Sequence, residues 1–245
     1  NNLHSGLDFY HGRLWKVADA DDTHVTFEMD SPDGDQGYPG ALVMKVTYSL
    51  DEENTLMIHY EAEPDQDTII NMTNHSYFNL NGHKSGDVLN HTLWLNADAF
   101  TPADAASIPT GEIRSVEGTP MDFRTDKTIG KDIGVDYEPL VFGKGYDHNW
   151  VLKNEGEFDK VAEVAGDESG IHMSVLTDLP GVQIYTANFL DGVKGRDGAV
   201  YEMRDAICLE TQYYPDAIHH ENFPGPICKK GEKYDTRTAY RFRVK

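Results

Sequence analysis

The sequence has few cysteines, few basic residues and no long apolar run, and each shortage excludes a class of protein. Its two cysteines, Cys208 and Cys228, are too few for a disulfide framework, and their spacing is not that of a zinc site. Lysine and arginine together number 21, against 42 aspartates and glutamates, so the formal net charge is -21. A membrane-spanning helix needs about 20 mainly apolar residues in succession, and the sequence has no such run.

The acidic balance narrows the range of partners. Nucleic acids and anionic membranes both attract basic surfaces, so we expect neither as a partner. A neutral small ligand is compatible with the charge, and most of the acidity is typical of a solubilising surface. The low cysteine content favours a reducing, cytoplasmic location. The chain begins "NNLHSG" without an initiator methionine, so a preceding segment or a removed signal stays open.

Helical periodicity is scarce too, whereas apolar and polar residues often alternate. Clusters of Gly, Asn, Asp and Ser separate the alternating segments, as expected for turns between strands. There is no βαβ alternation, internal repeat or linker, so we predict an all-β antiparallel sandwich or barrel in one domain over residues 1–245. The alternating segments are residues 24–30, 41–50, 55–63, 92–98, 181–189, 206–212 and 239–245.

One of these predicted strands carries a carboxylate at its centre. In "AICLETQ", residues 206–212, Ile207 and Leu209 share one face, and Cys208, Glu210 and Gln212 share the other. The first face is typical of a core. The second places Glu210 in a semi-apolar row, which is an unusual position for a charge unless the residue has a function.

A second informative segment is "TIINMTNHSYFNLNGH", residues 68–83. If it is extended, Asn71, Thr73, His75 and Tyr77 lie on one face and form a row of hydrogen-bonding groups. Ile70, Met72 and Asn74 lie on the other face. The row that contains His75 therefore marks a candidate binding surface.

Three further segments add polar groups. In "GVQIYTANF", Gln183 alternates with apolar residues, and "KGYDHNWVL" groups Asp147, His148 and Asn149 after a glycine. "NNLHSG" places His4 in a turn. Each group also has a structural interpretation. A lone histidine on a strand is commonly a satisfied structural residue, and Asp147 could cap a turn. Tyrosines can be core aromatics with one polar end.

A metal site is the least favoured interpretation of the remaining polar residues. "AIHHENFP", residues 217–224, contains His219, His220 and Glu221. Adjacent residues of an extended chain point apart, and no third spaced ligand is evident. We therefore predict no metal. Nor do the glycines form a phosphate-binding loop.

Together, the polar groups predict a sugar site. A carboxylate, an imidazole, a second carboxylate, an amide and several tyrosines come from separate strands or loops, and each lies on a face that should otherwise be buried. In a closed sheet architecture they can converge on one concave surface. Carboxylates and amides bind sugar hydroxyls, and aromatic rings stack on the C–H face of a sugar.

At this level of detail the sequence resembles a known family, the aldose 1-epimerases or galactose mutarotases. The motifs that carry the resemblance occur in the family's order with similar spacing. The resemblance implies a β-supersandwich fold, with large antiparallel sheets, and the interconversion of the α and β anomers of free hexoses such as galactose and glucose. The motifs are "NNLHSG", "TNHSYFNLNG", "GYDHNWVL", "PGVQIYTANFLDG", "LETQYYPDAIHHENFP" and the closing "YRFRVK".

The resemblance also implies roles for particular residues. The histidine of "NHSYFNL" corresponds to the family's general acid, here His75, and the glutamate of "LETQ" to its general base, here Glu210. The remaining matched positions belong to the family's sugar-binding residues. They are His4, Ser76, Tyr77, Asp147 and Gln183.

Two departures from the family's pattern stand out. The family has a region before its "LHGG" motif, with an arginine that reaches the sugar, whereas this chain begins at the equivalent of that motif. We therefore expect an N-terminally incomplete domain, and Arg13 lies at the wrong place to replace that arginine. The second departure is His219-His220, where the family commonly has Asn-Gln; the role of the two histidines stays open.

The implied chemistry needs only an acid and a base. Opening a hemiacetal removes a proton from the C1 hydroxyl and delivers one to the ring oxygen, and closing reverses both transfers. A base and an acid on opposite sides of the ring suffice, without metal or cofactor. We expect partial burial or a nearby carboxylate to tune His75.

Two other functions remain as alternatives. A hexose-6-phosphate 1-epimerase would need basic residues for the phosphate, and none cluster near the motifs. A non-catalytic sugar-binding protein of the same fold is the other, and the presence of both His75 and Glu210 disfavours it. The expected partner is a small-molecule sugar, and the oligomeric state is monomer or homodimer.

Overall fold

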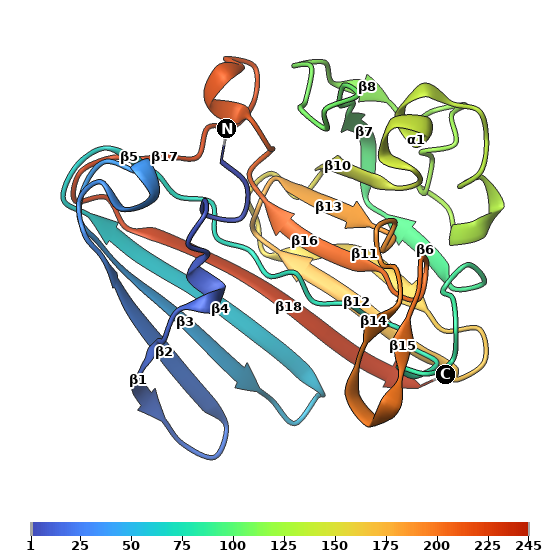
Figure 1. Cartoon of the computed structure of the whole chain (residues 1–245), viewed down its shortest axis with the longest axis horizontal. Coiled ribbons are helices and arrows are strands. Elements are labelled where there is room, and N and C mark those ends of the chain that lie inside the picture. Colours follow the sequence, from blue (N-terminus) through green and yellow to red (C-terminus); the bar gives the residue numbers. More distant parts are fainter. Residues whose placement is uncertain (1, 245) are drawn as a thin grey trace.

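The computed structural model describes residues 2–244 and consists mainly of antiparallel strands (Figure 1). The largest sheet has nine strands, and its C-terminal strand β18 lies in the middle of it. In spatial order these strands are β1 (Lys16–Ala20), β2 (His24–Ser31), β3 (Leu42–Leu50), β4 (Thr55–Pro64), β18 (Tyr234–Val244), β12 (Ile171–Thr177), β11 (Asp159–Ala165), β6 (Thr92–Leu95) and β9 (Lys127–Thr128).

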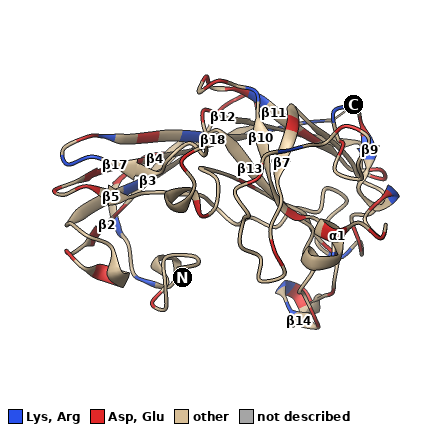
Figure 2. Ribbon diagram, turned by 90° about the horizontal axis from the view of Figure 1, so that it is seen from above, with Lys and Arg blue, Asp and Glu red and all other residues tan. Residues whose placement is uncertain are grey.

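A second sheet of five strands lies against one half of the first, as Figures 1 and 2 show. Its strands, in spatial order, are β16 (Cys208–Gln212), β13 (Gly181–Tyr185), β10 (Asp147–Leu152), β7 (Ala97–Thr101) and β8 (Arg114–Ser115). Two small pairs complete the sheets. They are β14 (Val193–Lys194) with β15 (Val200–Tyr201), and β17 (Ile227–Cys228) with β5 (Thr68–Ile69).

Helical structure within residues 2–244 is limited to short elements. They are α1 (Glu138–Gly143) and five 3₁₀ turns, η1 (Tyr10–Gly12), η2 (Asp35–Gly37), η3 (Ile129–Lys131), η4 (Arg196–Gly198) and η5 (Ala217–His219). None of the helices within residues 2–244 has the length and apolar character needed to cross a membrane.

The hydrophobic core lies between the two sheets. Alternation produces it: Ile58, Tyr60 and Ala62 on β4 are buried at every second position, as are Met173 and Val175 on β12. The opposing layer supplies large side chains, including the fully buried Trp150 and Phe100. A single core cluster contains residues of both sheets.

The strands β1 to β4 extend beyond this two-layered half (Figures 1 and 2). Every residue of β1 is exposed, and Val17 on it remains 62% exposed. On the neighbouring strands Phe27, Val46 and Tyr48 face an open cleft instead of a second sheet. Acidic residues are spread over the edges and loops of both halves (Figure 2).

The predicted strands are confirmed, with several differences in extent. The strand predicted over 206–212 begins at Cys208, and the one over 239–245 begins at Tyr234, with residue 245 outside the described residues. Residues 92–98 form two strands because the chain passes at Asn96 from the large sheet into the small one. The segment 181–189 is a strand only as far as Tyr185. Residues 70–77 pair with no strand, although Ile70 is buried and Asn71 exposed, as the predicted alternation requires.

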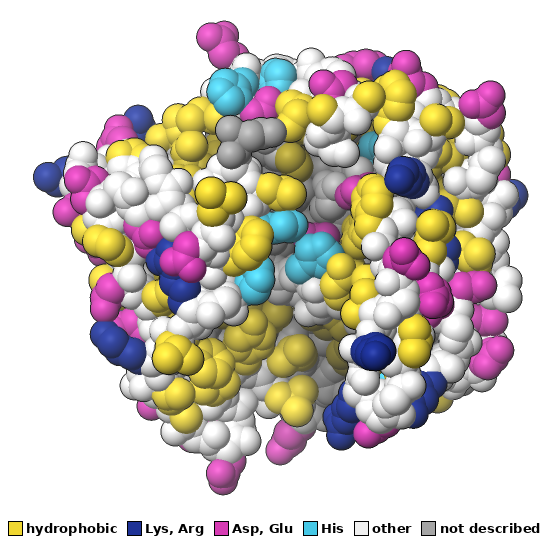
Figure 3. Space-filling model, viewed as in Figure 1, with side chains coloured by type: hydrophobic (Ala, Val, Ile, Leu, Met, Phe, Trp, Pro, Cys, Tyr) yellow, Lys and Arg dark blue, Asp and Glu magenta, His cyan; other side chains and the backbone are white. Residues whose placement is uncertain are grey.

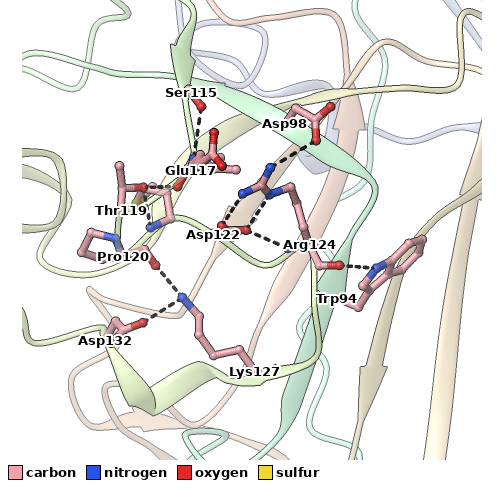
Figure 4. Close-up of polar contacts among 12 residues, drawn as sticks. Trp94, Asp98, Ser115, Glu117, Thr119, Pro120, Asp122, Arg124, Lys127 and Asp132 are labelled. Carbon is pink, nitrogen blue, oxygen red and sulfur yellow. Dashed lines mark hydrogen bonds and ion pairs between the residues drawn. The ribbon is translucent and has the colours of Figure 1, made fainter.

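A long segment with little regular structure, residues 102–137, covers one end of the five-stranded sheet and is held by polar contacts (Figure 4). Arg124 donates two hydrogen bonds to Asp122, at 2.7 and 3.0 Å. The ammonium group of Lys127 donates to the carbonyl of Pro120 at 2.7 Å and to Asp132 at 2.9 Å. These contacts stabilise a loop that has few strand hydrogen bonds of its own.

Candidate active site

The antiparallel register of β16, β13 and β10 places polar side chains in two adjacent rows. In the first row, Glu210 pairs with Gln183, and Gln183 pairs with Asn149. Two residues away, and therefore on the same face, Cys208 pairs with Tyr185 and Tyr185 with Asp147. The intervening residues face the core. This face of the five-stranded sheet forms the floor of the candidate site.

Hydrogen bonds connect the groups on this floor. The amide of Gln183 donates to Oδ1 of Asp147 at 2.8 Å, and its carbonyl oxygen accepts from Gln212 at 3.3 Å. Gln212 also lies 3.3 Å from Oδ1 of Asn149. The chain of amides fixes the orientation of Asp147 and leaves its second carboxylate oxygen without a protein donor among the described residues.

His75 faces this floor from the irregular segment between β5 and β6. Its neighbour Asn74 anchors the segment, because Asn74 accepts a hydrogen bond from the Tyr240 hydroxyl at 3.1 Å and donates to that of Tyr60 at 3.3 Å. Nε2 of His75 thereby lies 3.5 Å from Oε1 of Glu210. Two residues that are far apart in the sequence are thus brought close together in the site.

Aromatic rings surround the imidazole of His75. Tyr77 is stacked on it, with ring centroids 4.9 Å apart, and Tyr185 meets it edge-on at 5.7 Å. His4 makes a second edge contact at 5.6 Å, from a backbone with a φ of 53°. Both Tyr77 and His75 remain partly accessible, with exposed fractions of 48% and 33%. The rings restrict the imidazole to one orientation that faces the cleft.

These groups open into a cleft of about 980 Å³. Figure 3 shows the hollow, with histidine side chains at its border and an apolar surface beside it. His4, Ser76 and Glu210 line one part of the cleft, and the faces of β2 to β4, the N-terminal segment and residues 68–77 line other parts. Asp147 and Gln183 lie on the sheet floor beyond Glu210. The cleft can therefore admit a sugar from solvent to the groups that surround His75.

The two carboxyls of the site have no cationic partner from Lys or Arg within residues 2–244. Burial, and then the charge of Asp147, raise the pKa of Glu210 to about 8. Burial likewise raises the pKa of Asp147, and its bond from Gln183 opposes that shift. Such unpaired, buried carboxyls cost stability and are typical of functional sites.

His75 shifts in the opposite direction. Burial lowers its pKa, and the neighbouring His4 lowers it further. With the pKa of Glu210 raised to about 8 and that of His75 lowered, the one proton of the pair lies on Glu210 at neutral pH, and the two groups do not form an ion pair. A pair that holds one mobile proton can act as acid and base in the same cycle.

Five of the predicted site residues line one cleft, whereas Asp147 and Gln183 do not line it and lie on the same face of the five-stranded sheet as Glu210. His4, Ser76 and Tyr77 line it with His75 and Glu210. The hydroxyl of Ser76 donates to Oδ1 of Asn74 at 2.8 Å.

The residues considered and set aside lie elsewhere. Arg13 lines the cleft but binds Asp35, at 2.5 and 2.9 Å, and Asp8. His219 and His220 share the carboxylate of Asp216 outside the lining of the cleft.

Sequence reasoning misplaced one residue. It grouped His148 with Asp147 and Asn149, but strand alternation turns His148 into the core, where it accepts a hydrogen bond from the backbone N–H of Asp147 at 3.1 Å. Cys208 lies on the face of Glu210, as alternation predicts, and is fully buried there. The contact of the Tyr185 ring with His75 could not be predicted, because the two residues are far apart in the sequence.

Comparison with known proteins gives one consistent result. A sequence model of the family described as aldose 1-epimerase matches residues 1–241. The galactose mutarotases of Bos taurus and Homo sapiens are 43% and 42% identical over 245 residues, and the aldose 1-epimerase of Escherichia coli is 38% identical. The matches cover 99–100% of this chain and 70% of each relative.

Solved structures agree with the sequence relatives. A GalM/aldose epimerase homologue from C. elegans superposes with a TM-score of 0.88 at 31% identity, covering 99% of this chain and 72% of that one. A galactose 1-epimerase from Lactobacillus acidophilus gives 0.85 at 28% identity, covering 99% and 70%. The predicted all-β, mutarotase-like fold class is confirmed.

Proposed function

Because the chain belongs to the aldose 1-epimerase family, we propose that it interconverts the α and β anomers of free hexoses, with galactose and glucose as substrates. The observation that supports this most directly is the pair formed by His75 and Glu210, 3.5 Å apart at the cleft. The relatives named galactose mutarotase support galactose as a substrate. The enzyme is accordingly an isomerase.

In the proposed mechanism Glu210 is the base and His75 the acid. The carboxylate of Glu210 takes the proton of the C1 hydroxyl, the bond between C1 and the ring oxygen breaks, and the imidazolium of His75 gives its proton to that oxygen. The aldehyde turns about its C1–C2 bond. Glu210 then returns a proton to the carbonyl oxygen while His75 recovers one from the C5 hydroxyl, and the ring closes on the other face.

The geometry refines one expectation about this chemistry. The sequence suggested an acid and a base on opposite sides of the ring, whereas the two groups adjoin each other. Adjacent groups suffice because the C1 hydroxyl and the ring oxygen are both bonded to C1. In the free protein at neutral pH the proton of the pair lies on Glu210, and its transfer to His75 gives the carboxylate and the imidazolium with which ring opening begins.

The remaining residues are proposed to hold the sugar. Asp147, oriented by Gln183, accepts hydrogen bonds from hydroxyls distant from C1, and Ser76 and Tyr77 contact the ring beside His75. His4 lies against His75 and is placed near the ring oxygen. Firm contacts at the distal hydroxyls leave C1 free to rotate in the open-chain form.

Neither alternative function gains support from the cleft. Among the described lining residues Arg13 is the only Lys or Arg, and Asp8 and Asp35 already bind it. A phosphate group would find no available cation there, which disfavours a hexose 6-phosphate. A purely sugar-binding role does not require the coupled pair of His75 and Glu210.

We also propose a cytoplasmic location and a monomeric or homodimeric state. Both cysteines are free and buried, which suits a reducing compartment. Size-exclusion chromatography with light scattering would distinguish the two assembly states.

The test of the function is polarimetry on fresh α-D-galactose and α-D-glucose. We expect the protein to accelerate the approach to anomeric equilibrium and the Glu210→Gln variant to lose about a hundred- to ten-thousand-fold in kcat. Glu112→Gln, a surface carboxyl paired with Arg114, is the matched control and should retain full activity. Equal activity in the Glu210→Gln variant would refute the assignment of the base, and saturable sugar binding without turnover in the parent would favour the binding protein.

A further inference from the structure

We propose that His75, Cys208 and Glu210 form a binding site for Zn²⁺ and similar thiophilic divalent cations, and that such an ion inhibits the enzyme. Each residue offers one ligand atom, and the imidazole nitrogen, the thiol sulfur and the carboxylate oxygen all lie within 4.8 Å of one another. Imidazole, thiolate and carboxylate are the three ligand types that zinc takes in proteins.

The spacing of two of the three ligand atoms already suits a tetrahedral ion. Zinc–ligand bonds of about 2.0 Å to nitrogen or oxygen and 2.3 Å to sulfur place ligand atoms roughly 3.3–3.6 Å apart. Nε2 of His75 and Oε1 of Glu210 are already separated by 3.5 Å. Cys208 and Glu210 are two residues apart on β16, so the strand backbone fixes both on one face.

Charge and ligand softness determine which ion fits. A thiolate, a carboxylate and a neutral imidazole carry two negative charges, which a divalent cation neutralises in a largely buried pocket. Asp147 adds a further carboxyl on the same face without a Lys or Arg partner among the described residues. The thiolate favours Zn²⁺ or Cd²⁺ over Mg²⁺ and Ca²⁺, which prefer oxygen ligands.

The ion can reach the site from solvent. Cys208 is fully buried and Glu210 nearly so, but a third of the His75 side chain is exposed toward the cleft. A water molecule from the cleft would complete four ligands. On binding, the thiol of Cys208 loses its proton to solvent, so binding releases protons and strengthens as the pH rises.

The functional consequence follows from the shared residues. An ion held by His75 and Glu210 removes both the proposed acid and the proposed base from the reaction and occupies the position of C1. Zinc and sugar therefore exclude each other, and inhibition is competitive. The inhibition rests on the proposed function, whereas the metal site does not.

A second cluster on the surface serves as an internal comparison. His59, Glu61 and Asp235 also present three ligand atoms within 4.8 Å of one another. Lys233 already occupies it, at 2.7 Å from Glu61 and 3.0 Å from Asp235. It has no thiol, so an ion bound there gives no thiolate absorption and does not depend on Cys208.

The experiment measures metal binding and activity separately. Calorimetric titration with Zn²⁺ gives affinity and proton release, Cd²⁺ reports thiolate ligation by its ultraviolet charge-transfer absorption, and polarimetry gives KM and kcat for galactose. The variants are Cys208→Ser, Cys208→Ala and the matched control Cys228→Ser, whose thiol lies on β17. Mg²⁺ is the hard-ion control.

We expect Zn²⁺ to raise KM without lowering kcat, and Mg²⁺ to have no effect. Cys208→Ser should bind Zn²⁺ at least about tenfold more weakly and lack the cadmium band, whereas Cys228→Ser should behave like the parent. If neither Cys208 variant folds, the cadmium band of Cys228→Ser still shows whether Cys208 binds the metal, because only Cys208 can then supply the thiolate.

Three results would overturn the inference. They are a missing cadmium band in Cys228→Ser, equal Zn²⁺ affinity in the parent and Cys208→Ser, or inhibition that sugar does not relieve. A protein that binds zinc through Cys208 but has no activity on either hexose would instead support the metal site and refute the proposed function.

Discussion

Two polar clusters of this molecule both contain carboxyl groups, but only one of them also supplies cationic partners for those groups. In the 102–137 segment, Asp122 lies against Arg124, which holds the pKa of that carboxyl below its ordinary value, and Asp132 is paired with Lys127 (Figure 4). In the cleft, Glu210 and Asp147 are buried without such a cation, and burial raises the pKa of both. Paired carboxyls stabilise a loop, whereas unpaired ones keep their protons available for chemistry.

The comparison predicts that activity and stability respond in opposite ways at the two clusters. The largest effect is expected for Glu210→Gln, which should lower kcat by about a hundred- to ten-thousand-fold and yet stabilise the fold. Burial raises the pKa of Glu210 from 4.5 to about 8, so this carboxyl takes up a proton on folding. The contribution of Glu210 to the free energy of unfolding is most favourable below about pH 4.5. As the pH rises to about 8, this contribution falls by as much as about 5 kcal/mol.

Denaturant unfolding of the parent and of Glu210→Gln tests the sign of this contribution to stability. Measurements at about pH 4, 6 and 8.5 span the titration of Glu210. The free energy of unfolding of the variant should exceed that of the parent increasingly toward alkaline pH. A difference that stays constant with pH would show that Glu210 is ionised in the folded protein.

The next effect concerns Asp147→Asn. The charge of Asp147 is the second cause of the raised pKa of Glu210, so its removal should move the alkaline limb of the pH–kcat profile to lower pH. Loss of a charged acceptor for the sugar should also raise KM by about ten- to a hundredfold. Asp159→Asn, at an exposed position of β11, is the control. An unchanged alkaline limb would show that the two carboxyls do not interact.

A smaller effect, on stability alone, is expected for Lys127→Met. The side chain of Lys127 is 9% exposed, and its loss leaves the Asp132 carboxylate without its donor and the Pro120 carbonyl with the Tyr146 hydroxyl alone. We expect the free energy of unfolding to fall by about 1–3 kcal/mol while kcat for galactose stays the same. Lys131→Met, an exposed neighbour, should be neutral in both measurements. A loss of kcat would mean that the 102–137 segment supports the cleft.

The smallest effect is expected for Asp122→Asn. Arg124 is more than a third exposed, so its pair with Asp122 contributes only about 0–1 kcal/mol. Because the pKa of Asp122 is lowered, that contribution is present above its ordinary value of 3.8 and is lost as the pH falls through the lowered one. Thermal unfolding of the parent and the variant should therefore differ slightly at neutral pH and coincide in acid.

Much of the fold could be predicted because strand alternation is a local property. It located β2, β3, β4 and β16, and it placed Glu210 and Gln212 on one face. The passage at Asn96 between sheets could not be predicted, since a strand that changes sheets keeps the same period-two pattern.

The candidate site, too, could be predicted only in part from the sequence. The family's motifs named His75 and Glu210, but their 3.5 Å separation depends on the contacts of Asn74 with Tyr240 and Tyr60, which no local pattern shows. Strand alternation, if applied to residues 147–149, would have predicted that His148 points into the core. The shared face of Cys208 followed from alternation, but its distance from His75 needed the tertiary structure.

The position of β18 also bears on how the chain can fold during synthesis. This strand follows every other described strand in sequence, yet it lies between β4 and β12 and pairs with both along most of its length (Figure 1). Until it leaves the ribosome, β4 and β12 each present an open edge, and the two halves of the large sheet have no direct link. Completion of the nine-stranded sheet therefore comes after the synthesis of every other described strand. Chaperones that shield exposed edges would have their greatest effect on this protein during that interval.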